Sequence, residues 1–167
     1  MPITTPDFVI RLSGGAANAS GNASLGGAKS ANAVSTAING LFDAVSAGEA
    51  VAGDVEYRCI YMHNANGTEA MTAARVWVSA NTPLAGTTLD IGVGTSAVNG
   101  TEQTIADEST APSGVTFSAP STAGAGLALG DIPASQHRAI WLRRTTTAGS
   151  GSSANDTWEL GLDCETA

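Results

Sequence analysis

The alternation of apolar and polar residues beyond position 53 predicts a series of short β-strands. In DVEYRCIYMHN (54–64) the odd-numbered side chains fall on one face of a strand and the even-numbered ones on the other. Neither face is wholly polar, so we predict a central strand that is covered on both sides. We expect Tyr57, Cys59 and Tyr61 to form its core face, and Glu56 and Arg58 to hold a second layer or a neighbouring subunit.

Further runs with the same period follow along the chain. They span residues 73–80, 87–94, 101–107, 114–119, 126–132, 137–146 and 157–165, and clusters of Gly, Asn, Pro and Ser separate them. Residues 7–12 are one more candidate. Short, regularly spaced strands predict an all-β, jelly-roll-like sandwich of about eight or nine strands in one domain.

Residues 33–50 are the one segment with apolar residues near helical spacing, although Gly40 interrupts it. We predict one short helix or helical turn there, with Phe42 pointing inward. The three tryptophans, Trp77, Trp141 and Trp158, lie in the middle of strand-like runs. We expect them to anchor the core, with stacking on a ligand as the alternative.

The first residues of the chain are too small and too polar to bury much apolar surface. After DFVIRL (7–12) comes SGGAANASGNASLGGAKSANA, which is mostly Gly, Ala, Ser and Asn. We predict an extended N-terminal arm over residues 1–28 that adds a strand to the body or to a neighbour, followed by a sandwich domain over 29–167. A disordered N-terminus is the alternative.

Charge and composition restrict the function. The net charge is −8, with 15 acidic and 7 basic residues, which opposes sequence-independent binding of nucleic acid. We find no signal-peptide pattern and no membrane-length apolar run, and we expect synthesis in a reducing cytoplasm. Cys59 and Cys164 lack metal-ligand spacing, so we predict buried free thiols, with a pair joining two core strands as the alternative.

The sequence offers little that catalysis could use. His63 and His137 lack metal-binding spacing, and no phosphate loop or nucleophile elbow is present. A loop calcium site would have to come from Asp90, Asp107, Glu108 and Asp131, which follow no spaced calcium motif. A polymer hydrolase would need a close carboxylate pair or a metal-bound water. We therefore predict a non-enzymatic protein without cofactor or metal.

Three long stretches also resemble a known family. LFDAVSAGEAVAGDVEYRCIYMHN (41–64), IGVGTSAVNGTEQTIADESTAPSGVTFSAP (91–120) and GDIPASQHRAIWLRRTT (130–146) are similar to small virion structural proteins of tailed bacteriophages. The resemblance spans roughly residues 25–146 and implies a capsid decoration, or cement, protein on the outer head surface that bridges major capsid proteins. A tail- or fibre-associated module that binds host-surface glycans is the alternative.

For a decoration protein, the expected partners are the major capsid protein and other copies of this chain, as a dimer or trimer with the trimer preferred. We expect no nucleic acid and no membrane as partner. Arg143 and Arg144 follow the apolar middle of their strand and are predicted to emerge at a rim. The residues expected to contact capsid or subunit are Phe8, Ile10, Arg11, Arg58, Arg143 and Arg144, and ordinary strand and surface positions are the alternative.

Overall fold

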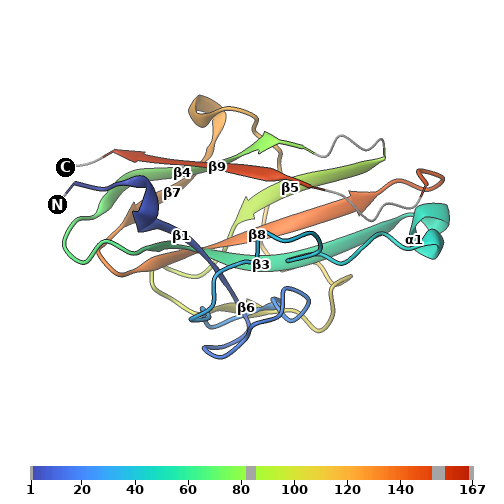
Figure 1. Ribbon diagram of the computed structural model, residues 1–167, viewed down its shortest axis with the longest axis horizontal. Coiled ribbons are helices and arrows are strands. Elements are labelled where there is room, and N and C mark those ends of the chain that lie inside the picture. The colour runs from blue at the N-terminus through green and yellow to red at the C-terminus, as the bar shows by residue number, and fades with distance from the viewer. Residues whose placement is uncertain (1, 82–85, 152–156, 166–167) are drawn as a thin grey trace.

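The chain folds as an all-β sandwich, in agreement with the sequence. The computed structural model describes residues 2–81, 86–151 and 157–165 (Figure 1). The larger sheet has the strand order β1-β3-β8-β5. Its strands are β1 (Phe8–Leu12), β3 (Asp54–Asn64), β8 (His137–Thr146) and β5 (Thr87–Val93), all antiparallel to their neighbours. The predicted strand over 54–64 is therefore confirmed as a central strand.

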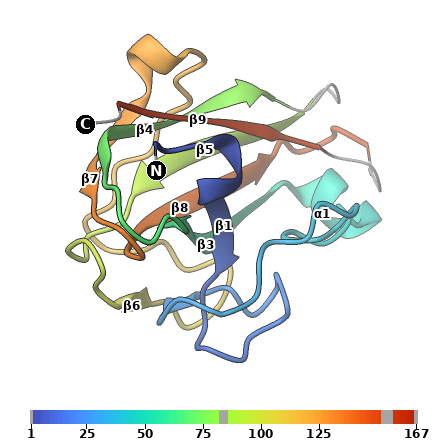
Figure 2. The ribbon, with the colours of Figure 1, turned by 60° about the vertical axis from the view of Figure 1, so that its left-hand side comes forward.

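The smaller sheet has three strands in the order β7-β4-β9 and packs on one face of the larger sheet (Figures 1 and 2). Its strands are β7 (Leu127–Ile132), β4 (Met71–Ala80) and β9 (Glu159–Glu165). The main core lies between the two sheets. Buried contributors from both sheets include Ile60, Met62, Ile140, Leu142, Met71, Val76, Val78 and Ile132.

A second core covers the opposite face of the larger sheet. It is built around Trp141, Tyr61 and Cys59, with Ile105 and Phe117 packed from the loops. The short ladder β2 (Gly26–Gly27) with β6 (Glu102–Thr104) lies on this side. Both faces of β3 are therefore covered, as predicted. The odd-numbered face contacts this second core, whereas the even-numbered face points between the sheets.

The N-terminal segment is folded against the body and does not extend away from it. β1 pairs with β3 of the same chain, and the loop after it returns to cover the outer edge of β1, where Val34 N donates to Ile10 O. Buried Ser13, Ser24 and Ser30 help to hydrogen-bond this loop, with Asn18 Nδ2 donating to Ser13 O. Polar side chains thus hold a segment that has few large apolar ones.

The predicted helix lies later than the apolar spacing suggested. α1 spans Ala47–Ala52, because Ser46 and Glu49 form a capping box at its start. Asn39 has a positive φ, so no right-handed helix runs through it, although Phe42 is buried as expected. Residues 114–119 are not a strand, because only Ser118 forms a bridge, with Ile91.

Candidate functional site

The ring of Phe42 is the centre of a buried charged cluster. The Arg58 Cζ atom lies 5.2 Å from the ring centroid, and the Arg144 Cζ atom lies 5.0 Å from it. Trp158 meets the same ring edge-on, at 5.6 Å between centroids. The electron-rich faces of an aromatic ring attract guanidinium groups, most strongly where water is excluded.

Strand pairing brings the two arginines together. Glu56 on β3 lies directly opposite Arg144 on β8, and Arg58 follows Glu56 on the same face of β3. This face points between the sheets, where Arg58 is 0% and Arg144 is 1% exposed. Arg144 is therefore not at a rim, and that prediction was wrong, because residues 41–43 cover the end of β8 where it lies.

The two guanidinium groups tie three loops to the larger sheet. Arg144 Nε donates to Glu56 Oε2 at 2.5 Å, and its Nη1 donates to Asp43 O at 2.5 Å. Arg58 Nη2 donates to Glu108 Oε2 at 2.5 Å and to Asn22 Oδ1 at 3.4 Å. The density of large and charged residues at 54–64 thus serves to fasten poorly structured segments around the central strand.

Every carboxyl group in this cluster pairs with at least one arginine. Oxygens of Asp43, Glu56 and Glu108 all lie within 4.8 Å of one another, but the two arginines lie among them and pair with each. A divalent cation would have to compete with these guanidinium groups. The cluster is therefore better described as a structural ion network than as a metal centre.

Glu56 is the member of the network with a clearly perturbed proton affinity. Burial raises its pKa to about 7, although Arg144 and Arg58 both act to lower it. Its Oε2 accepts from Arg144, whereas its Oε1 accepts no hydrogen bond from the described residues and lies 3.7 Å from Arg58 Nη2. The fold thus holds one carboxyl group near its midpoint of protonation at neutral pH.

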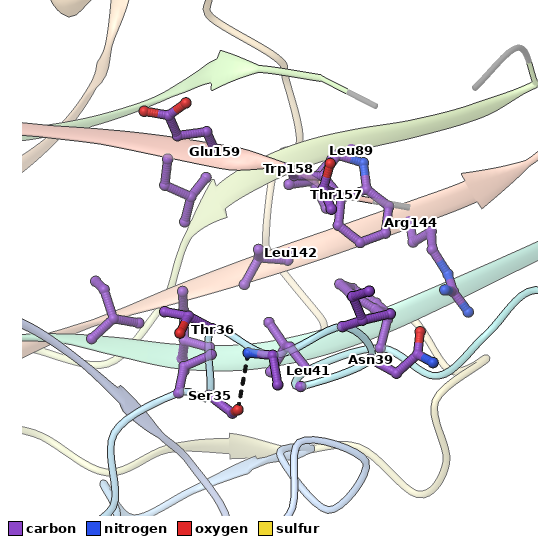
Figure 3. Close-up of a pocket in the computed structure, with 18 of the residues that line it drawn as sticks. Ser35, Thr36, Asn39, Leu41, Leu89, Leu142, Arg144, Thr157, Trp158 and Glu159 are labelled. Carbon is purple, nitrogen blue, oxygen red and sulfur yellow. Dashed lines mark hydrogen bonds between the residues drawn. The ribbon is translucent and has the colours of Figure 1, made fainter. Parts of the chain in front are cut away.

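A cavity of about 440 Å³ adjoins the network (Figure 3). Residues 34–43 form one wall and residues 157–160, at the start of β9, form the other. Its floor is the main core, with Ile60, Leu89 and Leu142, and Arg144 stands at one end. A mostly apolar cavity of this size that reaches the core is suited to bind apolar groups.

The other residues predicted to make contacts lie outside the ion network. Phe8 and Ile10 are partly buried and pack against the main core, and Arg11 Nη1 donates to Ala31 O. Arg143 forms an ion pair with Asp90, with its Nη2 2.7 Å from Oδ2, and remains 34% exposed. The structure does not bring Phe8, Arg11 and Arg143 together with Arg58 and Arg144, whereas Ile10 lines the same cavity as Arg144. The role of all four in contacts stays a prediction.

The acidic and imidazole candidates all have local partners. Asp90 and Glu108 pair with arginines, Asp131 accepts from Ala73 N, and Asp107 accepts from Ser109 N. The ring of His137 packs edge-on against Tyr61, and His63 Nδ1 lies 3.1 Å from Gln136 O.

The tryptophans and cysteines divide between core and surface. Trp141 is fully buried in the second core, whereas Trp77 and Trp158 are partly exposed. Cys59 and Cys164 are both free thiols, as predicted, but only Cys59 is fully buried.

Sequence reasoning did not find the cavity. Its lining comes from residues 34–43 and 157–160, which the sequence assigned to a helix and to a strand end. Their convergence depends on how the two sheets lie over each other.

In the part of the chain that the structure describes, no helix has the length and apolar character needed to cross a membrane.

Comparisons of the chain with protein-family models, curated proteins and solved structures find no match.

Proposed function

We propose that this chain is a non-enzymatic structural protein of a tailed-bacteriophage virion. In this role it decorates the outer surface of the mature head and bridges major capsid proteins. Its partners would be the major capsid protein and further copies of itself, and a trimer is the preferred assembly.

One observation supports the proposal most directly. The three stretches that resemble phage virion proteins, 41–64, 91–120 and 130–146, supply most of the buried ion network: Asp43, Glu56, Arg58, Glu108 and Arg144. The resemblance therefore falls on residues that meet in space and fix the shape of the subunit.

A rigid subunit suits this role for a physical reason. A cement protein binds through modest contacts that are repeated over a symmetric shell, so its total attachment depends on multivalency. Repetition strengthens binding only if the contact surfaces keep a fixed geometry, and ordering a flexible subunit at each site would cost affinity. Loops fastened by buried arginines, and a folded N-terminal segment, keep that cost small.

Reconstitution tests the proposal. Mature capsids of the phage that encodes this chain would be prepared without it, mixed with the purified protein and imaged by electron cryomicroscopy. Ordered density at regular lattice positions, together with slower release of genome on heating, is the expected result. Bare capsids at saturating protein would contradict the decoration role.

A second candidate is a tail- or fibre-associated module that binds host-surface glycans, and Trp77 is the observation that favours it. Its partly exposed indole lies on the outer face of the smaller sheet, over Gly161, where an added Cβ would be 2.0 Å from a ring atom. A flat aromatic side chain beside a small residue is suited to stack on a sugar. Binding of the protein to host-surface glycans, abolished by Trp77→Ala, would favour this role over decoration.

A further inference from the structure

We propose that the outer edge of β9 and the cavity below it form a docking site for an extended segment of another protein. This segment would add a fourth strand to the smaller sheet, with alternating apolar and basic side chains. The inference does not depend on the decoration role, since it concerns the kind of segment that the edge accepts.

The larger sheet has four strands and the smaller sheet three, and β9 is an edge strand of the smaller sheet. In the described residues the backbone of β9 pairs with β4 alone. The edges of the larger sheet are better covered: Val34 N donates to Ile10 O on β1, and Ser118 exchanges two backbone hydrogen bonds with Ile91 on β5. An uncovered edge strand is a template for another chain.

The cavity lies where an added strand would place its inward side chains. Trp158 and Leu160 line it from the β9 side, and Ile10 and Val34 line it from the larger sheet and the loop that follows. Figure 3 shows the cavity between β9 and the strands β8 and β3 below it. Ile38, another lining residue, is 59% exposed, which is unusual for an isoleucine. No lining residue comes from β7, the other edge of the smaller sheet.

The spacing of a strand matches this arrangement. Alternate side chains of a strand point to the same face, about 7 Å apart. A segment that pairs with β9 would therefore direct alternate side chains inward, and those beside Trp158 and Leu160 would enter the apolar cavity. The side chains between them would lie on the outer face of the smaller sheet.

The charge on that outer face selects the partner. The exposed side chains of β9 are acidic, at Glu159, Asp163 and Glu165, whereas Leu160 and Leu162 pack toward the main core. Arg75 on β4 lies opposite Asp163. Opposite charges stabilise cross-strand pairs and like charges destabilise them, so lysine or arginine is favoured at the outward positions. Two copies of β9 edge to edge would bring acidic faces together, which disfavours a second copy of this chain as the occupant.

Short peptides test the inference on the intact protein. The probe is an eight-residue peptide that alternates valine and lysine, titrated into isotopically labelled protein and followed by amide chemical shifts. One control peptide replaces each lysine with glutamate. A second carries proline at alternate positions, which removes the amide donors needed for a ladder. The expected result is saturable binding of the lysine peptide alone, with shifts confined to β9 and the cavity lining.

Two variants locate the site. Ile38→Asp places a charge at the cavity mouth, and Glu159→Gln with Glu165→Gln removes two outward charges; all three positions are at least partly open to solvent. The matched control for the glutamine pair is Thr101→Lys with Ala106→Lys, which raises the net charge by the same amount at exposed positions outside the cavity and β9. Each test variant should weaken binding roughly two- to tenfold, whereas the control should bind like the parent.

The opposite outcomes would overturn the proposal. These are no saturable binding at millimolar peptide, equal binding of the proline or glutamate peptide, or shifts centred on another surface. Concentration-dependent self-association that perturbs β9 in the absence of peptide would assign the edge to a second copy of this chain instead.

Discussion

Replacement of Arg144 by methionine is the sharpest test of the buried ion network. Methionine keeps much of the length of the side chain but removes the donors to Glu56 and to Asp43. Glu56 would then remain between the sheets with Arg58 as its nearest cation, 3.7 Å away. The variant therefore measures how much the free energy of unfolding falls when Glu56 loses its main cationic partner.

The magnitude follows from burial and from pH. Breaking a buried ion pair from one side typically costs about 3–5 kcal/mol, and we expect this range at pH 8. The folded-state pKa of Glu56 is about 7, against an ordinary value of 4.5. Its contribution to stability is thus complete below pH 4.5 and lost as pH rises toward 7. Without Arg144 this pKa rises further, and because pH 8 lies about one unit above the parent value, the rise adds at most about 1.4 kcal/mol of destabilisation at pH 8.

Urea unfolding of the parent and of Arg144→Met at pH 5 and pH 8 checks this reasoning. At pH 5 Glu56 carries a proton in the folded state, so we expect a smaller loss, about 2 kcal/mol. The matched control is Arg143→Met, the neighbouring residue, whose ion pair with Asp90 is partly exposed and should cost about 1 kcal/mol. If Arg144→Met does not fold, Arg144→Lys keeps the charge and gives a smaller loss of the same sign.

Two results would refute the argument. The first is a loss for Arg144→Met no larger than that for Arg143→Met. The second is an equal loss at both pH values, which would mean that Glu56 does not titrate between them.

Three further outcomes are expected. Tyr61→Phe removes two hydrogen bonds, from the hydroxyl to Gly27 O and from Glu102 N to the hydroxyl, and should cost about 1–3 kcal/mol in urea unfolding with faster amide exchange in β2 and β6. Gly161→Ala should push the Trp77 indole off β9 and change its fluorescence, at a cost of about 1–3 kcal/mol; an unchanged spectrum would contradict the close contact. Burial raises the pKa of both thiols, but an aromatic disulfide reagent should label Cys164 in the native protein and Cys59 only after unfolding. Prompt labelling of two thiols would show that the second core opens readily.

Many of the strands could be predicted from the sequence, because the alternation of side chains between the two faces of a strand is a local property. Residues 54–64, 87–93 and 137–146 alternate clearly, and each is a strand in the structure. The segment 114–119 alternates as well, yet its backbone meets β5 only at Ser118, since a strand also needs a neighbour along its length. The packing of the N-terminal loop against the body could not be predicted, because the loop has few large apolar residues. Its serines and Asn18 hold it through hydrogen bonds, which leave no periodic pattern in the sequence.

Three features could be predicted from residue order alone: the all-β class, the two-sided burial of 54–64 and the inward position of Phe42. All three depend on alternation and side-chain size. The burial of Arg58 and Arg144 against that ring depends on contacts between segments far apart in the chain. The pattern along β8 places an arginine at its end, but whether that end meets water depends on residues 41–43, about a hundred positions earlier. The cavity under β9 has the same origin, since it exists only where two sheets of unequal width lie over each other.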